Sequence, residues 1–412
     1  MKQKLSSALI VIIFVIVAAM PALAVQQNTA AAGTPFMHTF ITSVRAGNGK
    51  GPSGGSSSSG PTSYPAYTPG QIFHAYNYSA NYNGTGETIA IIDAYGSPSI
   101  QNDVKVFDSQ FNLPPIKLTV LSPFGKVGRN AGWALETSLD VEWSHAMAPN
   151  ASILLIEAPS ASTTYLITDS INYIVNHTHA NVVSMSWGAA ESGLTASELS
   201  QYSSTFAYAA SHGVIMVAAS GDSGANDSTS SPTVNYPASD PSVVGAGGTT
   251  LQLANINSTS ATYSYEYAWN SSGGGISTYF PEPSYQSAAH INASRRAVPD
   301  VSYDANPNTG FWIYDSTTYE GLKGWIQVGG TSASSPQWAA IFTEVQQYKG
   351  STTFNGTNVL SSLYSVYSSS TEYASAFHDI TIGYNGYYYA GTGYDEVTGI
   401  GSPNVGALME YL

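Results

Sequence analysis

An apolar run turns sharply into a long helical pattern at Val328-Gly329-Gly330-Thr331-Ser332-Ala333-Ser334-Ser335-Pro336. The two glycines allow a backbone turn where a side chain would clash, and Pro336 suits the first turn of a helix expected over residues 337–348. Ser332 would then lie at a helix N-terminus, where free N–H groups and the helix dipole favour a negatively charged oxygen. The position suits a serine nucleophile, and a Ser/Gly turn that only caps a core helix is the alternative.

Short apolar runs alternate with helical patterns on the N-terminal side of this stretch. This alternation is typical of strands that are buried on both faces and connected by crossover helices. The sequence therefore predicts an α/β fold, with a parallel sheet flanked by helices on both faces. The expected strands cover residues 88–93, 116–121, 152–157, 182–186 and 214–219, and the expected helices cover residues 99–110, 134–146, 165–176 and 196–212.

The composition limits the possible classes of protein. The chain has 412 residues, of which 43% are hydrophobic, so it can bury a large core as one or two domains. Charged residues make up only 9%, with 12 Lys and Arg against 26 Asp and Glu, and the formal net charge is −14. This balance argues against nucleic-acid binding, because a basic patch supplies that affinity. The sequence has no cysteine, which excludes disulfides, and its neutral polar residues hint at acidic surroundings.

The N-terminus has the three-part pattern of a cleaved secretory signal over residues 1–24. Lys2 and Lys4 precede an apolar run, and Ala22-Leu23-Ala24 stands at the expected cleavage site. A permanent N-terminal anchor is the alternative, because the apolar run is near the lower limit for a membrane span. With the signal cleaved, we expect a secreted, extracellular protein without a stable membrane span.

The composition changes again before the compact part of the chain. Residues 25–64 are predicted to form a flexible N-terminal segment that ends in a Gly/Ser linker. The compact domain is expected over residues 65–412. We find no internal repeat in it.

An acidic residue follows the apolar run at residues 214–219. Asp222 lies between glycines in Ser220-Gly221-Asp222-Ser223-Gly224, at the carboxyl end of an expected parallel strand, where ligands bind in such sheets. Burial would disfavour the charged form and keep Asp222 protonated, so that it could donate a hydrogen bond. The alternative is an Asx turn that ends the strand.

Glu136 and Asp140 lie four residues apart and share one face of the helix expected at residues 134–146. If the pair faces inward, one carboxyl pKa should rise so that the two groups share a proton, which makes a carboxylate a useful base. The alternative is a solvated acidic stripe. His145, His212 and His378 are other candidates for a base, but imidazolium has no free lone pair in acid. We expect these histidines to be ordinary; if one of them is an exception, it is His145, one turn beyond Asp140.

The order of the Glu/Asp, Asp and Ser motifs resembles that of the sedolisins, the serine-carboxyl peptidases. The resemblance covers about residue 67 to the C-terminus, and it implies a subtilisin-like fold and a serine-type endopeptidase that acts at acidic pH. Other segments similar to the family are Ile91-Ile92-Asp93-Ala94-Tyr95-Gly96, Ser184-Met185-Ser186-Trp187-Gly188, Gly273-Gly274-Gly275-Ile276-Ser277 and Val298-Pro299-Asp300-Val301-Ser302.

The resemblance implies a role for each candidate residue. Glu136 would take the Ser332 hydroxyl proton as general base, and Ser332 would form an acyl-enzyme. Asp140 would orient Glu136 and share its charge. Asp222, protonated, would donate to the tetrahedral oxyanion together with the Ser332 N–H. The family positions that extend the Glu/Asp hydrogen-bond network are matched by Asp93 and Trp187.

The C-terminal tail has a second candidate site, for one structural Ca²⁺. Two carboxylates frame a glycine-rich loop, and Ca²⁺ takes about six to eight oxygens from carboxylates, backbone carbonyls and water. A bare turn is the alternative. The resemblance places the ligands at the side chains of Asp379 and Asp395 and at the carbonyls of Ile380, Gly391 and Gly393.

One feature departs from the family. Sedolisins carry a large N-terminal prosegment, and we expect no room for one between Ala24 and Tyr67. The enzyme would then fold unaided, use a prosegment on a separate chain, be made without latency, or be a degenerate relative. The expected partners are protein or peptide substrates and a separate prosegment or inhibitor, and the expected state is a monomer. The alternative functions are a secreted or surface-layer binding protein on an inactive peptidase scaffold and, less favoured, a histidine-based serine hydrolase.

Overall fold

The computed structural model describes residues 35–38, 40–45 and 66–412. The expected signal at residues 1–24 and the Gly/Ser linker therefore lie outside the described residues. In the described part of the chain, no helix combines the length and the apolar character that a membrane span requires.

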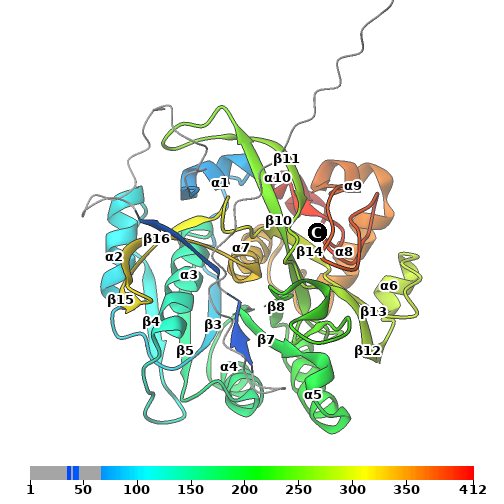
Figure 1. The fold of residues 1–412 in the computed structure, drawn as a ribbon, viewed down its shortest axis with the longest axis horizontal. Coiled ribbons are helices and arrows are strands. Elements are labelled where there is room, and N and C mark those ends of the chain that lie inside the picture. Colours follow the sequence, from blue (N-terminus) through cyan, green and yellow to red (C-terminus); the bar gives the residue numbers. More distant parts are fainter. Residues whose placement is uncertain (1–34, 39, 46–65) are drawn as a thin grey trace, which may run out of the picture.

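A parallel sheet forms the middle layer of the molecule (Figure 1). Its strands follow the order β11-β10-β8-β6-β3-β5-β4, with β14 also paired to β10, and only the β10–β11 pair is antiparallel. The predicted α/β fold is confirmed. The strands are β3 (Thr88–Ala94), β4 (Lys117–Leu121), β5 (Ser152–Ala158), β6 (Val182–Met185), β8 (Ile215–Ala219), β10 (Val244–Ala254), β11 (Thr262–Ala268) and β14 (Val301–Asp304).

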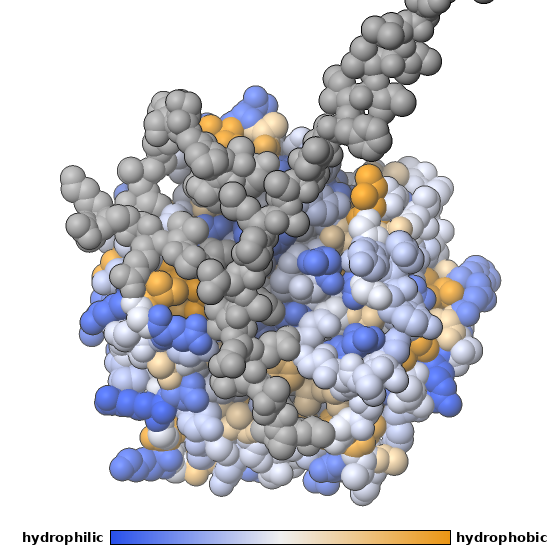
Figure 2. Space-filling model, in the orientation of Figure 1, coloured by the Kyte–Doolittle hydropathy of each residue, from blue (hydrophilic) through white to orange (hydrophobic). Residues whose placement is uncertain are grey.

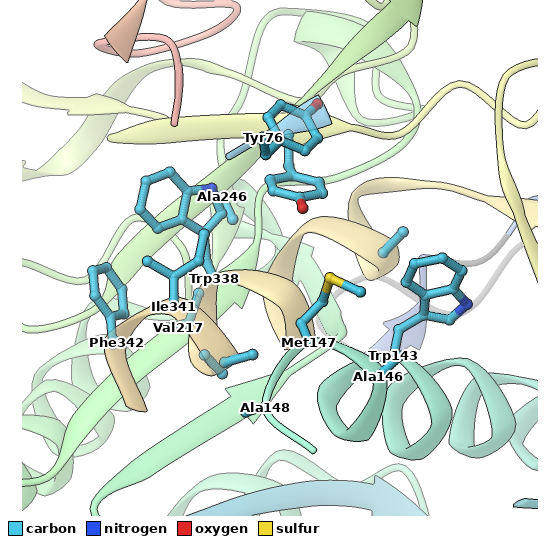
Figure 3. Packing of buried hydrophobic residues seen from close by; sticks show 14 of the residues in the cluster. Tyr76, Trp143, Ala146, Met147, Ala148, Val217, Ala246, Trp338, Ile341 and Phe342 are labelled. Carbon is cyan, nitrogen blue, oxygen red and sulfur yellow. The ribbon is translucent and has the colours of Figure 1, made fainter. Parts of the chain in front are cut away.

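Helices cover both faces of this sheet because successive strand residues point to opposite sides. Ile89 and Ile91 pack into one core, and Ala90 and Ile92 pack into the other. In the first core, Trp338, Ile341 and Phe342 lie against Val217 and Ala246 (Figure 3). That core holds α1 (Pro69–Ala75), α2 (Ile100–Phe111), α3 (Ala131–Met147), α7 (Thr331–Lys349), α8 (Val359–Ser368) and α10 (Val405–Tyr411), and the second holds α4 (Ser170–His177) and α5 (Ala196–Ser211).

The predicted elements before Ala219 are present, with small shifts at their ends. The helix expected at residues 134–146 begins earlier, at Ala131, because the Asn130 side chain accepts a hydrogen bond from the Trp133 N–H (3.1 Å) and caps it. The helix expected at residues 165–176 is divided into a π-helical turn, Thr164–Asp169, and α4.

The prediction for Pro336 is wrong in one respect. Helix α7 begins at Thr331, so Pro336 is its sixth residue and not part of its first turn. Because proline has no N–H, the carbonyl of Ser332 lacks its usual partner four residues on. The hydroxyl of Ser186 lies 3.2 Å from that carbonyl and donates to it instead. Ser332 itself lies at the helix N-terminus, as predicted.

Residues 36–37 and 40–45, within the segment that was predicted to be flexible, form two short strands, and the rest of that segment, apart from residues 35 and 38, lies outside the described residues. Strand β1 (Phe36–Met37) pairs antiparallel with β7 (Trp187–Ala190), which also pairs with β9 (Asn235–Tyr236). Strand β2 (Phe40–Arg45) pairs antiparallel with β16 (Leu322–Gly329), the partner of β15 (Phe311–Tyr319). In Figure 1 both segments cross the molecule as dark blue strands close to α7.

The remaining elements surround the C-terminal part of the sheet. The remaining elements are β12 (Gly275–Pro281), β13 (Arg295–Val298), α6 (Ser284–Ala288), α9 (Ser370–Ala376), β17 (Phe377–His378) and β18 (Ser402–Pro403), with short 3₁₀ turns at Glu191–Gly193 and Gly224–Asn226.

The face in Figure 2 carries mainly polar residues, with apolar residues in small separate groups, as the composition predicts.

Candidate active site

Ser332 is buried at the N-terminus of α7, beside the carboxyl ends of the parallel strands. Its hydroxyl donates to the carbonyl oxygen of Ser186 (3.2 Å), in the connection between β6 and β7. Its backbone N–H donates to the carbonyl oxygen of His38 (3.4 Å). The serine therefore faces the segment that joins β1 to β2, and its amide already binds a carbonyl group.

Asp222 lies next to Ser332, at the end of β8. Its Oδ1 accepts hydrogen bonds from the N–H and the hydroxyl of Thr331, both at 2.7 Å. Its Oδ2 has no partner among the described residues. Burial raises the pKa of Asp222 to about 8, although the two bonds from Thr331 act in the opposite direction. Below that pH the free oxygen can carry a proton.

Gly330 explains how a carbonyl group reaches this oxygen. It has a φ of 108°, in the region that favours glycine, and a Cβ there would collide with both the His38 carbonyl oxygen and Asp222 Oδ2. The absence of a side chain thus leaves room for both the His38 carbonyl oxygen and Asp222 Oδ2 beside Gly330, while the same carbonyl accepts from the Ser332 N–H.

Glu136 and Asp140 are completely buried on α3, which packs against α7. The expected inward orientation is therefore present, and the alternative of a solvated stripe is excluded. Burial, followed by the charges of Asp93 and Glu136, raises the pKa of Asp140 well above its ordinary value. The Ser186 hydroxyl donates to Asp140 Oδ1 (2.6 Å), so one serine side chain contacts both Asp140 and the Ser332 carbonyl.

Asp93 and Trp187 take different positions in this region. Asp93 lies buried near the end of β3, and burial raises its pKa to about 7. Its charge also acts on Asp140, which places it in the acidic cluster. The Trp187 indole N–H donates to the carbonyl of Ile92 (2.6 Å), so it holds the backbone beside Asp93 and does not extend the network through a carboxylate.

The three histidines considered as bases lie elsewhere. His145 Nε2 contacts the carbonyl of Pro114 (2.9 Å) and Asp108 (3.2 Å). His212 is exposed at the end of α5, and His378 stacks on Tyr263. They are ordinary in the sense we expected.

Sequence reasoning missed several residues that contact the site. Thr331 holds Asp222, Ser186 links Asp140 to Ser332, and His38 approaches from a distant segment. The signal for Thr331 and Ser186 was their place inside the family-like motifs, and the signal for His38 was the run Phe-Met-His-Thr-Phe-Ile at residues 36–41, which is rich in strand-forming residues.

The predicted calcium ligands lie around one turn. The Gly393 N–H donates to both carboxylate oxygens of Asp379 (3.0 and 3.2 Å), and the Gly391 N–H donates to Asp395 (3.2 Å). Burial raises the pKa of Asp395 to about 6. In the part of the chain that the structure describes, no group of three or more His, Cys, Asp or Glu side chains is arranged to hold a metal, and no donor contacts the carbonyls of Ile380, Gly391 or Gly393.

This chain is similar to known proteins. Residues 129–364 match the family described as "Subtilase family". Kumamolisin from Bacillus sp. (strain MN-32) is 32% identical over 84% of this chain, and sedolisin from Pseudomonas sp. (strain 101) is 29% identical over 84%. The chain spans 63% and 61% of the lengths of these two relatives.

A solved structure of Pseudomonas sedolisin, described as a serine-carboxyl proteinase complexed with two molecules of pseudo-iodotyrostatin, is also similar. Its TM-score is 0.76 at 30% identity, and the match covers 85% of this chain and 98% of that chain. The likeness thus extends over most of this chain and nearly the whole of that chain.

Proposed function

Because the chain belongs to the subtilase family, in its sedolisin branch, we propose that it is an acid-acting serine endopeptidase. Ser332 is the nucleophile, Glu136 the general base, Asp140 the residue that orients Glu136, and Asp222 the side-chain donor of the oxyanion hole. The observation that carries this proposal is the buried Oδ2 of Asp222, which has no partner among the described residues and lies, like the His38 carbonyl oxygen, against Gly330.

The proposed reaction begins with the Ser332 hydroxyl. Glu136 takes its proton as Oγ attacks the substrate carbonyl carbon, and the developing oxyanion accepts hydrogen bonds from the Ser332 N–H and the Asp222 carboxyl O–H. The proton then passes to the leaving amine, and water hydrolyses the acyl-enzyme by the same steps. Asp140 holds the shared proton because its pKa is raised, which leaves Glu136 able to accept another one.

The protonation of Asp222 sets the alkaline limit of the proposed activity. With a pKa of about 8, its carboxyl group keeps the proton throughout acidic and neutral solution and loses it above that pH. The oxyanion donor is therefore lost on the alkaline side, and activity on the acid side ends when Glu136 is protonated. A histidine base would already be protonated in mildly acidic solution, so its activity would be confined to neutral and higher pH.

The test is cleavage of a denatured protein across about pH 2 to 8 by the wild type, Ser332→Ala and Glu136→Gln. We expect acid-optimal cleavage that falls by about 10⁴-fold or more in both variants. A wild type that binds the substrate without cleaving it at any pH would support the alternative, a binding protein on an inactive scaffold. The presence of all four residues in one chain, each of them buried, favours the enzyme.

We also propose one structural Ca²⁺ at the C-terminal turn. The residue types suit a hard cation, because Ca²⁺ binds carboxylates and backbone carbonyls, although the Asp379 and Asp395 carboxylates accept N–H bonds from Gly393 and Gly391 in this structure. Asp379 and Asp395, with the carbonyls of Ile380, Gly391 and Gly393, would hold the ion and fix the turn. If so, a chelator should lower the melting temperature, and Asp379→Asn should remove most of that sensitivity. An unchanged melting temperature in the wild type would refute the site.

The proposed setting is extracellular. The signal pattern at residues 1–24 and the low content of basic residues favour export into acidic surroundings. Protein or peptide substrates are the proposed partners. N-terminal sequencing of the protein from the culture medium, compared with the membrane fraction, would separate secretion from anchoring.

A further inference from the structure

A loop near the C-terminus exposes several large side chains. In the part of the chain whose side chains the structure describes, ten large hydrophobic residues are exposed, and four of them lie within residues 382–389. They are Ile382, Tyr384, Tyr387 and Tyr389, which are between 48% and 74% exposed. Single apolar side chains are normal on a protein surface, but a cluster of them marks an interaction site. We call residues 382–389 the tyrosine loop.

The backbone of the tyrosine loop forms a closed turn. The N–H of Asn385 donates to the carbonyl oxygen of Tyr388 (3.1 Å), and the Tyr388 N–H donates to the Asn385 side chain (3.0 Å). A backbone bridge joins Tyr384 to Tyr389, whose rings stack with their centroids 5.3 Å apart. Because these rings are already held in place, a ligand that packs on them loses little conformational entropy.

The tyrosine loop is joined to the candidate active site by Asn385. The Asn385 side chain is buried and donates to the carbonyl oxygen of Ser272 (3.2 Å), and the Asn385 carbonyl accepts from the Ala225 N–H (2.9 Å). Ala225 follows Asp222 by three residues in the chain. An extended polypeptide spans about 3.3 Å for each residue, so one substrate chain can reach both Asp222 and the loop.

The neighbouring strand β11 adds two more tyrosines. The N–H of Ala268, at the end of this strand, donates to the Ile382 carbonyl (2.8 Å), so β11 ends beside the loop. Tyr265 and Tyr267 lie two residues apart and therefore share one face of the strand. Their rings stack with centroids 6.4 Å apart, and Tyr265 is exposed. Aromatic side chains are thus present along β11 as well as on the loop.

The chemistry of this surface favours an uncharged, apolar ligand. Residues 380–394 include no Asp, Glu, Lys, Arg or His, so the loop has no charge of its own to attract an ionic ligand. Tyrosine instead presents a large ring, which packs against aromatic and aliphatic side chains. A folded protein buries most side chains of this kind, and an unfolded polypeptide exposes them. An unfolded substrate of the peptidase therefore has the chemistry that the loop can bind.

We propose that the tyrosine loop binds aromatic and aliphatic side chains of an unfolded polypeptide substrate while another part of that polypeptide lies at Ser332. The inference rests on the proposed peptidase function. Contacts away from the reacting bond are equally strong in the bound substrate and in the transition state, so they lower KM and leave kcat unchanged. Of two substrates with the same scissile bond, the one with apolar neighbours is therefore favoured.

The test compares two unstructured polypeptides that contain the same cleavage site. Tyr, Phe and Leu flank the site in one, and Ser, Thr and Gln flank it in the other. We expect the wild type to have a KM about tenfold lower for the apolar-flanked polypeptide. The double variant Tyr384→Ser/Tyr389→Ser should lose most of this preference with kcat unchanged. Equal KM values in the wild type, or a preference that the double variant retains, would overturn the inference.

The matched control is the double variant Tyr208→Ser/Tyr348→Ser. It removes two exposed tyrosines from α5 and α7 and should keep the preference, and a control that loses the preference as well would contradict a specific role of the loop. Hydrolysis of an acylated amino-acid ester, which is too short to reach the loop, shows that each variant is folded and has an active Ser332.

The remaining outcomes separate this inference from the proposed function. A wild type that cleaves neither polypeptide would refute the proposed function and this inference with it, whereas cleavage of both at equal KM would refute this inference alone. A second copy of the chain is the other possible occupant of the loop. Light scattering would then show a wild-type dimer that Tyr384→Ser/Tyr389→Ser converts to a monomer, and substrate binding at the loop would be wrong.

Discussion

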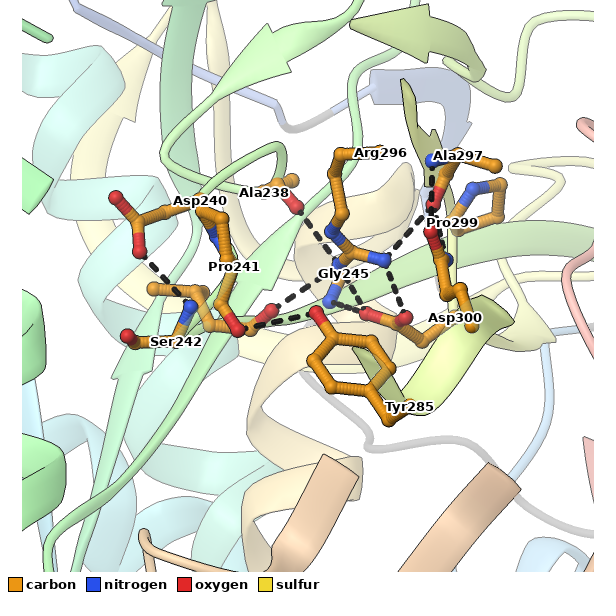
Figure 4. Close-up of polar contacts among 12 residues, drawn as sticks. Ala238, Asp240, Pro241, Ser242, Gly245, Tyr285, Arg296, Ala297, Pro299 and Asp300 are labelled. Carbon is orange, nitrogen blue, oxygen red and sulfur yellow. Dashed lines mark hydrogen bonds and ion pairs between the residues drawn. The ribbon is translucent and has the colours of Figure 1, made fainter. Parts of the chain in front are cut away.

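Two regions of this molecule bury carboxyl groups in opposite ways. At the end of β13, Asp300 is paired with the buried guanidinium of Arg296, at 2.6 and 2.5 Å, and also accepts from the Gly245 N–H (2.8 Å) (Figure 4). Around Ser332, Asp93, Asp140 and Asp222 are equally buried, but neither of the two ion pairs among the described side chains involves them.

The difference shows what each region is suited to do. Burial opposes the charge on Arg296, but the Asp300 carboxylate outweighs this effect and raises the pKa of Arg296 above its ordinary value. The Arg296 guanidinium also donates to the carbonyls of Ala238 and Val243, so it holds β13 against the neighbouring loops. The site carboxyl groups have no such cation, so burial raises their pKa and they hold protons that a reaction can use.

Removing the cation from the paired region should have the largest effect. Arg296→Met leaves Asp300 buried without its partner, which we expect to cost about 3–5 kcal/mol of unfolding free energy. The neighbouring Arg295 is exposed, so Arg295→Met is the matched control and should change stability by less than about 0.5 kcal/mol. Urea unfolding of both variants measures the difference. Similar midpoints would mean that the pair contributes nothing to stability.

Around Ser332, where the buried carboxyl groups have no cation, a substitution should change the activity. Asp222→Ala removes the oxyanion donor, and kcat/KM should fall by about 10²–10³, equivalent to roughly 3–4 kcal/mol of transition-state stabilisation. Asp222→Asn keeps an N–H₂ group that can donate, so its loss should be smaller. Steady-state kinetics at acidic pH compare the two variants. If both lose the same amount, Asp222 does not act as a hydrogen-bond donor.

The pH dependence of stability should also distinguish the regions. The pKa of Asp93 rises from 3.8 to about 7 in the folded protein, so the folded state binds a proton that the unfolded chain releases. The contribution of Asp93 to stability is complete below about pH 4 and is lost as the pH rises to about 7. The loss is at most about 1.4 kcal/mol of unfolding free energy for each pH unit. Melting temperatures should therefore fall from acid to neutral solution, and Asp93→Asn should flatten the decline. A wild type that is equally stable at both ends would contradict the raised pKa.

The sequence predicted the strands of the sheet, but it did not predict which distant segments lie against them. Strand β3 was predictable because its residues are apolar on both faces, and the Glu136–Asp140 spacing placed both groups on one helix face. The position of Pro336 was not predictable, because the Ser186 hydroxyl that compensates for its missing N–H is about 150 residues away in sequence. The place of His38 depends on pairing across a similar distance, which leaves no local period.

The protonation of Asp222 is the central claim, and infrared spectroscopy tests it most directly. A protonated carboxyl group has a C=O stretching band that its carboxylate lacks, and the difference between the wild type and Asp222→Asn isolates the band of this residue. We predict that the band persists through acidic and neutral solution and disappears with a midpoint at about pH 8. A midpoint near the ordinary value of 3.8 would show that Asp222 is charged when the enzyme works, and the proposed oxyanion hole would then be wrong.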